Sequence, residues 1–551
     1  MSKTLFLFIF ILKLVLLPFL SSSQKPNILW ITVEDISPTL SMYGDSTSKT
    51  PNLDEFASES LIYTESYTTV GVCSPSRSSL ITGMYPVSIG THQMRTGKDV
   101  FGWGSRDYDG SSNAIDVNGN PIPLYSVVTP PEVKCFTEYL RAAGYYCTNN
   151  SKTDYQFAAP VTAWDQNGDK AHWKNRNKNQ PFFSVFNFDV THESKMWLHR
   201  NKPLTVDPKK VPLPPYFPDT DTVRNDVARN YSNIELLDIL VGNLLDELKS
   251  DGLYDSTYVF FFSDHGGPLP RGKRSHYESG LRVPMIIRNP FEKLQRYVHD
   301  PVSFVDIAPT ILSLVDIEIP NHFQGNPFLG EKKDKIPRNF IFGSGDRFDE
   351  TYDRVRSVIS KDYIYVKNYH IDRPAYKDVL YRKNIDMTNE MFRLYKEEKL
   401  NADQVYWYRQ TKTKEEFYIR SIDPYSLNNV IDDLNYKSQI NKHRKALKNW
   451  QNKIYDIGYL SEKDHLENMW PKGIQPITKK PDIIIRNQLV TIKSKTKGSS
   501  NAYIVSDKNF EPNLDDGWKL YHKPIKINKG YLYIKSTRLG YKDSEILKIE
   551  L

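Results

Sequence analysis

The sequence predicts an α/β fold followed by a smaller β-rich region, on three observations. Continuous apolar runs at residues 27–33, 182–188 and 258–262 are typical of strands buried in a parallel sheet. Residues 223–249 carry apolar side chains at helical spacing, which predicts a long amphipathic helix between the last two strands. From residue 481 onward, short strand-like runs alternate with turns, which predicts a small β-sandwich.

Local signals predict the other elements of the first half. Thr50 followed by Pro51 is typical of a helix start, and residues 61–70 form a strand-like run that leads to Cys73. Residues 100–131 are rich in Gly, Asn, Ser and Pro, so we expect an insertion that shapes substrate access. Residues 132–143 predict a helix that ends at Gly144.

The second half predicts shorter elements. Residues 285–288 predict a strand, and Asp306 begins a predicted helix. Short strands and charged segments alternate as far as residue 425, and residues 427–457 predict a further helix. The strand-like runs of the β-sandwich lie at residues 502–505, 518–521, 524–527 and 531–534.

Length and composition are those of a globular protein with two or more domains. The 551 residues are 39% hydrophobic and 25% charged. A net charge of +7 suits acidic ligands, and the sequence has no basic tract with interleaved aromatics that would indicate nucleic-acid binding. Aromatic residues reach 13%, which suits stacking on sugar rings, although many of them will lie in the core.

Residues 1–23 have the pattern of a secretory signal peptide. Lys3 gives a positive start, residues 5–20 are apolar except for Lys13, and three serines follow. A retained membrane anchor is the alternative, but Lys13 and Pro18 interrupt a stretch already short for spanning a bilayer. We therefore expect removal of the segment and a secreted or periplasmic protein without a stable membrane anchor.

The three cysteines do not form a disulfide framework. They are Cys73, Cys135 and Cys147. Export permits a disulfide between Cys135 and Cys147, and two buried thiols are the alternative.

Cys73 begins a segment with unusual chemistry. Pro75 suits the first turn of a helix and Gly83 suits its end, so Cys73 is expected at a helix N-terminus, where negative charge is favoured. Arg77 lies one turn further along on the same face. A buried structural cysteine would explain neither Pro75 nor Arg77, so the segment predicts a nucleophile beside an anionic substrate.

Two predicted strands end in acidic residues. Glu34 and Asp35 follow the first strand, and Asp264 with His265 follows the strand at residues 258–262. Open α/β sheets place their sites at these strand ends. Because adjacent carboxylates repel each other, we expect a divalent cation there, and oxygen ligands favour a hard ion such as calcium.

The segment that begins at Cys73 resembles the signature of the type I sulfatases, Cys-x-Pro-x-Arg followed by Leu-x-Thr-Gly. The matching residues are Cys73, Pro75, Arg77, Leu80, Thr82 and Gly83. The resemblance implies that a maturation enzyme oxidises Cys73 to formylglycine, whose hydrated aldehyde attacks the sulfur of a sulfate ester. It also implies an alkaline-phosphatase-like α/β domain at residues 24–334, a smaller C-terminal α+β subdomain with a helix at 335–470, and the β-sandwich at 481–551.

The resemblance assigns roles to further residues. The set that it implies for one calcium ion is Glu34, Asp35, Cys73, Asp264 and His265. Glu34 stands where the family has aspartate, so its side chain is longer by one methylene group. Arg77, Lys152 and Lys273 match cationic residues that act on the nucleophile and the sulfate, and His192 matches a strand-end histidine that protonates the leaving group.

Four candidate substrate contacts complete the prediction. Asp154 stands where the family has histidine, and Arg274 and His276 accompany Lys273 in a basic segment. His92 lies either at the pocket rim or in an exposed loop.

We therefore expect a sulfuric ester hydrolase that acts on a sulfated polysaccharide or its oligosaccharides. Ulvan is the first choice, by similarity to algal-polysaccharide sulfatases. One alternative is a phosphoester or phosphonate hydrolase of the same superfamily, which rates on aryl sulfate and aryl phosphate would separate. The other is a carbohydrate-binding protein with a degenerate enzyme domain; retention of Cys73, Arg77, Lys152, Asp264 and Lys273 argues against it.

Overall fold

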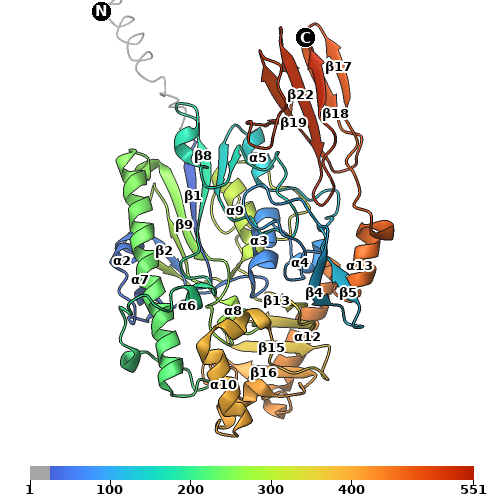
Figure 1. The fold of residues 1–551 in the computed structure, drawn as a ribbon. Coiled ribbons are helices and arrows are strands. Elements are labelled where there is room, and N and C mark those ends of the chain that lie inside the picture. Colours follow the sequence, from blue (N-terminus) through green and yellow to red (C-terminus); the bar gives the residue numbers. More distant parts are fainter. Residues whose placement is uncertain (1–24) are drawn as a thin grey trace, which may run out of the picture.

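The computed structural model describes residues 25–551, so the expected signal peptide lies outside the described residues. A mixed eight-stranded sheet forms the centre of the larger domain, in the order β11-β2-β10-β9-β1-β8-β6-β7. Its strands are β1 (Asn27–Val33), β2 (Leu61–Tyr63), β6 (Tyr146–Asn150), β7 (Gln166–Asn167), β8 (Phe182–Phe188), β9 (Thr257–Ser263), β10 (Met285–Arg288) and β11 (Arg296–Val298). This architecture confirms the predicted α/β class (Figure 1).

Strand β1 lies at the middle of this sheet and runs parallel to both neighbours. Trp30 is paired with Val185 of β8 and with Phe260 of β9. All seven residues of β1 and of β9 are buried, as their apolar runs predict. Because these strands are parallel, their carboxyl ends meet at one edge, and the segments after them come together there.

Helices cover both faces of the sheet (Figure 1). On one face, α2 (Pro51–Ala57) and α7 (Asp221–Ser250) pack on Leu29 and Ile31 of β1. On the other, α3 (Cys73–Thr82) and α9 (Ile307–Leu314) pack on Ile28 and Trp30. The alternation of β1 residues between two cores follows from the two-residue period of a strand.

Helix α3 has the limits that its sequence predicts. Cys73 is its first residue, and Gly83 follows its end at φ 67°, with its N–H donating to Ser79 O. Glycine is well suited to that left-handed conformation. All ten residues of the helix are buried, so Cys73 is fixed beneath the edge of the sheet.

The second region contains a four-stranded antiparallel sheet. Its strands are β13 (Ile341–Gly345), β14 (Val355–Ile359), β15 (Tyr363–Asn368) and β16 (Glu415–Ile419). Helix α12 (Lys437–Ile454) packs Leu447 and Trp450 against Val358 and Tyr365 of this sheet. Helix α10 (Asp386–Lys396) contacts α7 of the first domain.

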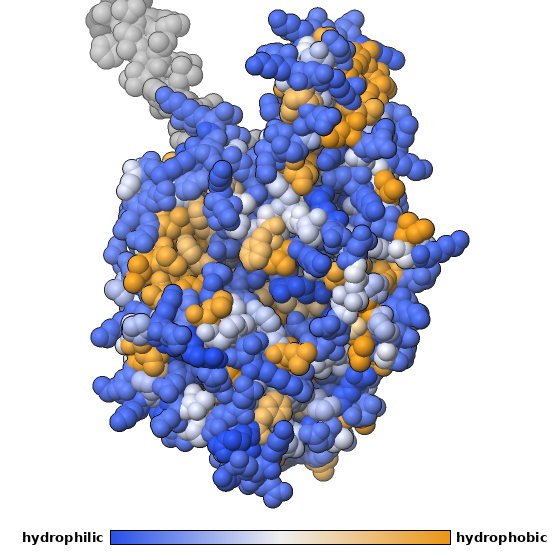
Figure 2. All heavy atoms as spheres, viewed as in Figure 1, coloured by the Kyte–Doolittle hydropathy of each residue, from blue (hydrophilic) through white to orange (hydrophobic). Residues whose placement is uncertain are grey.

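Two further sheets form the C-terminal β-sandwich. One contains β17 (Asp482–Arg486), β18 (Leu489–Lys493) and β21 (Ile525–Lys526); the other contains β19 (Ser500–Ser506), β20 (Lys519–Tyr521), β22 (Tyr531–Thr537) and β23 (Leu547–Glu550). Val490, Ile492, Leu532 and Ile534 share one core between them. Figure 2 shows apolar side chains gathered over this part of a largely hydrophilic surface.

Short elements complete the described chain. They are β3 (Ser66–Tyr67), β4 (Ser111–Ile115), β5 (Pro121–Pro123), β12 (Val302–Ser303), α4 (Pro86–Ile89), α5 (Thr137–Ala142), α6 (Lys195–Leu198), α8 (Glu278–Leu281), α11 (Ala402–Val405) and α13 (Glu462–Met469). Within residues 25–551, no helix combines the length and apolarity needed to cross a bilayer. Cys135 and Cys147 are buried free thiols, which is the second of the two expected arrangements.

Two predicted helices start later than expected. Helix α5 begins at Thr137, not at residue 132, because the preceding segment is bound to α3: Phe136 N–H donates to Ile81 O at 2.8 Å. Helix α12 begins at Lys437, not at residue 427, because the preceding residues extend along β16. There Val430 N–H donates to Phe417 O at 2.9 Å.

Candidate active site

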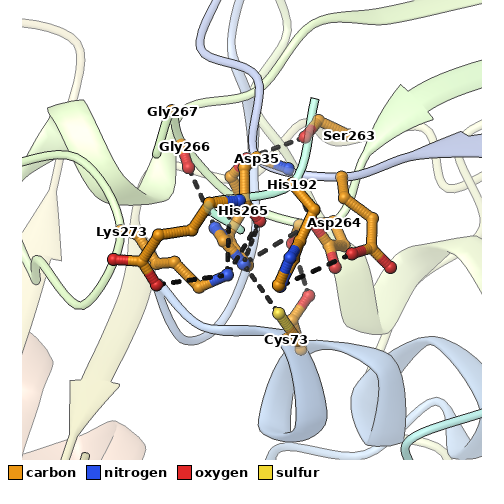
Figure 3. Close-up of polar contacts among 12 residues, drawn as sticks. Asp35, Cys73, His192, Ser263, Asp264, His265, Gly266, Gly267 and Lys273 are labelled. Atoms are coloured by element: carbon orange, nitrogen blue, oxygen red, sulfur yellow. Dashed lines mark hydrogen bonds and ion pairs between the residues drawn. The ribbon is translucent and has the colours of Figure 1, made fainter. Parts of the chain in front are cut away.

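Cys73 faces the two acidic strand ends (Figure 3). Its Sγ atom lies 3.2 Å from Nε2 of His265, which follows β9, and the residue is fully buried. His265 Nε2 in turn lies 3.1 Å from Oδ1 of Asp35 and 3.6 Å from Oδ1 of Asp264. The parallel strands β1 and β9 therefore bring together side chains that are some 230 residues apart in sequence.

Four side chains in this group could hold one metal ion. Donor atoms of Asp35, Cys73, Asp264 and His265 all lie within 4.8 Å of one another, and all four residues are buried. Asp35 is fixed in this position by two contacts: its N–H donates to Asp264 Oδ1 at 3.2 Å, and its Oδ2 accepts the Glu193 N–H at 2.7 Å. Two buried carboxylates this close suit a divalent cation that prefers oxygen ligands.

The charge on His265 shows how strongly this group attracts positive charge. Burial alone lowers the pKa of a histidine, because it penalises the charged form. The carboxylates of Asp264 and Asp35 outweigh that effect and raise the pKa of His265 to about 9. The donor set therefore fits a cation, and the residues present are compatible with the calcium expected from the sequence.

Glu34 is turned away from this four-residue group. Its Oε1 lies 3.2 Å from Arg77 Nη2 and 2.5 Å from Lys152 Nζ, and its Oε2 lies 3.7 Å from His192 Nε2. Burial raises the pKa of Glu34, although Lys152 and Arg77 act in the opposite direction. Its donor atoms do meet those of Asp35 and His192 in a second possible metal group.

Three cationic side chains surround Cys73. Arg77 donates from Nε to Asp264 at 3.1 Å, and Lys273 Nζ donates to the two carboxylate oxygens of Asp35 at 2.8 and 3.0 Å. The third is Lys152, paired with Glu34. All three are buried, so their charges act in a medium that screens them little.

His192 lies at the more open side of the group, with 15% of its side chain exposed. Ser194 N–H donates to its Nδ1 at 3.2 Å, which leaves the ring proton on Nε2. Burial, followed by the charges of Lys273 and Lys152, holds the pKa of His192 well below its usual value. It is therefore a neutral N–H donor near pH 7.

The candidate substrate contacts fall into two groups. Asp154 lies beside the helix start, where it accepts hydrogen bonds from Ser74 and, at 2.8 Å, from Arg95. Arg274 is buried in ion pairs with Glu193 and with Asp349, at 2.7 and 2.6 Å. The structure brings both residues next to the group around Cys73.

The other two candidates do not reach that group. The His92 ring is buried, 6.0 Å from the ring of His465, which corrects the alternative of an exposed loop residue. His276 lines a small cavity that Lys273 and Arg274 also line, but none of Asp35, Cys73, Asp264 or His265 reaches it. Their assignment as substrate contacts stays a prediction that this geometry does not favour.

Sequence reasoning missed two residues that shape the site, Asn187 and Glu193, whereas Arg95 belongs to the segment with His92 that was expected either at the pocket rim or in an exposed loop. Asn187, on β8, accepts from Arg77 Nη1 at 2.7 Å, and Glu193 binds both Asp35 and Arg274. Arg95 is 37% exposed at its side chain and binds Asp154. The signal for Glu193 was its place beside His192; Asn187 is a polar residue in an otherwise apolar strand.

Comparison with family models gives two matches. The model described as Sulfatase matches residues 26–160 and 148–317, a region that contains every residue of the group described above. The model described as N-sulphoglucosamine sulphohydrolase, C-terminal, matches residues 271–406.

Known proteins resemble the chain over most of its length. It is 39% identical to an ulvan-active sulfatase of Formosa agariphila, covering 96% of this chain and 91% of that protein. It is 26% identical to human N-sulphoglucosamine sulphohydrolase, covering 83% and 96%. A protein solved in complex with its substrate D-glucosamine-2-N,6-O-disulfate aligns with a TM-score of 0.55 at 16% identity, covering 78% of this chain and 98% of that one, which shows a shared fold.

Proposed function

Because this chain belongs to the sulfatase family, we propose that it hydrolyses sulfate esters of ulvan or of oligosaccharides derived from it, with Cys73 as formylglycine and with one calcium ion. The observation that carries the proposal is the convergence of Cys73 with Asp35, Asp264 and His265 at one buried point. Similarity to the ulvan-active sulfatase of Formosa agariphila supports the substrate.

The charged residues of the site suit an anionic ester. When bound, calcium would polarise the sulfate group, and formylglycine would supply the attacking hydroxyl. Arg77, Lys152 and Lys273, each bound to a carboxylate next to Cys73, bring fixed positive charge to the site. Such preorganised charges stabilise the negative charge that develops in the transition state.

Proton donation to the leaving alcohol is assigned to His192. Its Nε2 lies 3.7 Å from Glu34 Oε2, beyond hydrogen-bond length, so this donor is available to a substrate oxygen. The partial exposure of His192 supports this role, because a substrate can reach its ring. Lys273 is thus assigned to the sulfate group, and His192 to the leaving oxygen at the other end of the scissile bond.

Aromatic side chains next to His192 suit a sugar ring. Tyr381 is 39% exposed, with its ring 6.4 Å from that of His192 and 4.9 Å from that of Trp197. Lys195 lies in the same short helix, α6, as Trp197. We propose that this pair of aromatic rings receives the sugar that carries the sulfate ester.

Sulfate release from a panel of glycans tests the proposal. Full-length protein, produced with the maturation enzyme and supplied with calcium, is incubated with ulvan oligosaccharides, carrageenan, fucoidan, glycosaminoglycans and the aryl esters of sulfate and phosphate. We expect the highest rate on ulvan oligosaccharides and a preference for aryl sulfate over aryl phosphate. Faster release from another glycan would replace ulvan as the substrate, and a preference for phosphate would overturn the proposed reaction.

The same preparation tests maturation and export. We propose that residues 1–23 are removed, that the protein acts outside the cytoplasm, and that residues 24–334, 335–470 and 481–551 are its structural units. Peptide mass spectrometry should find the Cys73 peptide with formylglycine in active protein. An unmodified thiol at full activity would contradict this assignment.

A further inference from the structure

The small cavity lined by His276 borders the segment that carries Lys273. Its volume is about 30 Å³, and none of Asp35, Cys73, Asp264 or His265 lines it. Its walls come from residues 271–277, 375–382 and 406–412, three segments distant in sequence. Seven of its thirteen lining residues are arginine or lysine and none is acidic, so its walls carry an unusual concentration of positive charge.

Carboxylates behind the walls balance only part of that charge. Lys377 and Lys412 share a single carboxylate, that of Asp353, at 3.1 and 2.6 Å. Arg271 is 4% exposed, and its guanidinium is bound by a carbonyl, Tyr425 O, at 2.9 Å and stacks on the Tyr216 ring at 4.6 Å. Among the described residues, no carboxylate forms an ion pair with Arg271, which leaves a buried charge uncompensated.

Several buried nitrogen atoms on these walls have no hydrogen-bond partner among the described residues. They are Nε and Nη1 of Arg271, Nη1 of Arg409 and both ring nitrogens of His276, of which the neutral ring offers one as an N–H donor. Arg271 and His276 are each more than nine-tenths buried. A buried donor without a partner costs stability, and a buried charge without a counter-charge costs more. A ligand that accepts hydrogen bonds and carries negative charge would remove both costs at once.

We propose that this cavity binds a small inorganic anion of the size of chloride. Arginine has five donors and no acceptor, so a ligand that only accepts suits it, whereas water would satisfy the N–H groups but leave the charge. The cavity volume of about 30 Å³ has room for one small anion.

The anion would stabilise the segment that positions Lys273. Arg271 and Arg274 have φ values of 64° and 67°, a conformation that costs non-glycine residues energy. Arg382, another wall residue, donates from Nη2 to the carbonyl oxygen of Lys273. An anion held between Arg271 and Arg382 would thus keep this strained segment against its neighbours.

Bromide soaking tests the site directly, because bromide replaces chloride and scatters anomalously. Crystals of the full-length protein are soaked in sodium bromide, and an anomalous peak is expected within contact distance of Arg271 and His276. Anomalous peaks elsewhere on the protein with none in this cavity would overturn the proposal.

A thermal titration tests it in solution. Sodium chloride replaces sodium isethionate, whose anion is too large for the cavity, at constant ionic strength. We expect a saturable rise in Tm of about 1–3 °C, as for any ligand that binds only the folded protein. A Tm that does not depend on chloride would overturn the proposal. Neither experiment depends on sulfatase activity, so both can fail while the proposed function stands.

Two variants locate the effect. Arg271→Gln should lose the chloride-dependent rise. Arg288→Gln is the matched control, because Arg288 is also buried and lies over a tyrosine ring, at 3.7 Å from Tyr254, but is paired with Glu59 and Asp255. Arg288→Gln should lower Tm but keep the chloride-dependent rise in Tm. If Arg271→Gln does not fold, Arg409→Gln should shift the titration to higher chloride; a wild-type titration in either cavity variant would overturn the assignment.

Discussion

His192 is held as a neutral imidazole at the entrance to the site, so it must bind a second proton, which the negative charge of a bound sulfate ester favours, before it can protonate the leaving alcohol. Ser194 fixes its tautomer, and burial with Lys273 and Lys152 keeps its pKa low. A proton donor matters most for a poor leaving group such as a sugar hydroxyl. His192→Ala should therefore lower kcat/KM on a sulfated glycan by about 10²–10⁴-fold, and that on nitrophenyl sulfate far less.

Lys273→Ala is the comparison for this variant. Lys273 is placed to contact the sulfate group, which both substrates share, so kcat/KM should fall by similar factors on the two. Equal losses for His192→Ala on glycan and aryl sulfate would remove His192 as the proton donor.

Asp264 gives a test of the metal site. Its carboxylate faces His265 at 3.6 Å and accepts a hydrogen bond from Arg77. Asp264→Asn removes one negative charge from the donor set, and calcium affinity depends on that charge. The calcium concentration for half-maximal activity of chelator-treated protein should rise by about tenfold or more.

Asp238→Asn is the matched control for the metal experiment. Asp238 is equally buried, but it accepts hydrogen bonds from the start of α2, away from the site, such as the Leu53 N–H at 2.8 Å. Its calcium requirement should be unchanged. Full activity of the chelator-treated wild type would contradict the metal assignment.

The residues of the site could be predicted only where the order of the strands along the chain places them at the same edge of the sheet. Asp35 and Asp264 follow parallel strands, so their proximity follows from strand order. Asn187 binds Arg77, which is 110 residues away in sequence, and no local pattern predicts that contact. The same limit applies to the arginine- and lysine-rich cavity around Arg271, whose walls come from three separate segments.

At the scale of elements, the contact between α7 and α10 contains a partly buried acid. Asp226 of α7 accepts the Met387 N–H at the start of α10, at 2.6 Å. Burial raises the pKa of Asp226 to about 6, above an unfolded value of about 3.9. The folded protein then binds more protons than the unfolded chain between these values, so stability falls as the pH rises through this window.

Asp226→Asn should remove this loss of folding stability at higher pH, while its amide oxygen still accepts the Met387 N–H. The variant should be more stable than wild type by about 2–3 kcal/mol above pH 6 and nearly equal to it below pH 4. Urea unfolding at both pH values measures this. Asp246→Asn, on the exposed face of the same helix, should show no such pH-dependent gain. A gain for Asp226→Asn that is the same at both pH values would contradict the assigned cause.

Helix limits show where local signals suffice. Helix α3 begins and ends as predicted because Pro75 in its first turn and Gly83 just after its end fix its limits through local backbone conformation. Helices α5 and α12 begin late because backbone groups before them bind distant elements, Ile81 and Phe417. Propensity and periodicity carry no information on such long-range partners.

At the scale of the whole molecule, the β-sandwich could be predicted as a unit but not as part of the larger core. Short alternating strands indicate it locally. Its attachment depends on residues with no distinguishing sequence signal: Trp518 and Ala502 pack in the same core as Leu140 of α5. Arg141 Nη2 also donates to Trp518 O at 2.7 Å.

This shared core predicts that the sandwich stabilises the catalytic domain. Deletion of residues 481–551 would expose the apolar surface beneath Trp518 and leave the Nε1 donor of Trp103 without its acceptor, Asp515, at 2.7 Å. We expect the truncated protein to aggregate or to lose its cooperative thermal transition. Trp518→Ala in the full chain should destabilise by about 3–5 kcal/mol, as for other buried tryptophans, and urea unfolding measures it. Trp407→Ala, in the second region, is the matched control. Trp407 and Trp518 belong to different cores, so the losses of unfolding free energy in the two single variants should add in the double variant. A stable, soluble truncated protein with the wild-type transition would show instead that the sandwich is an independent appendage.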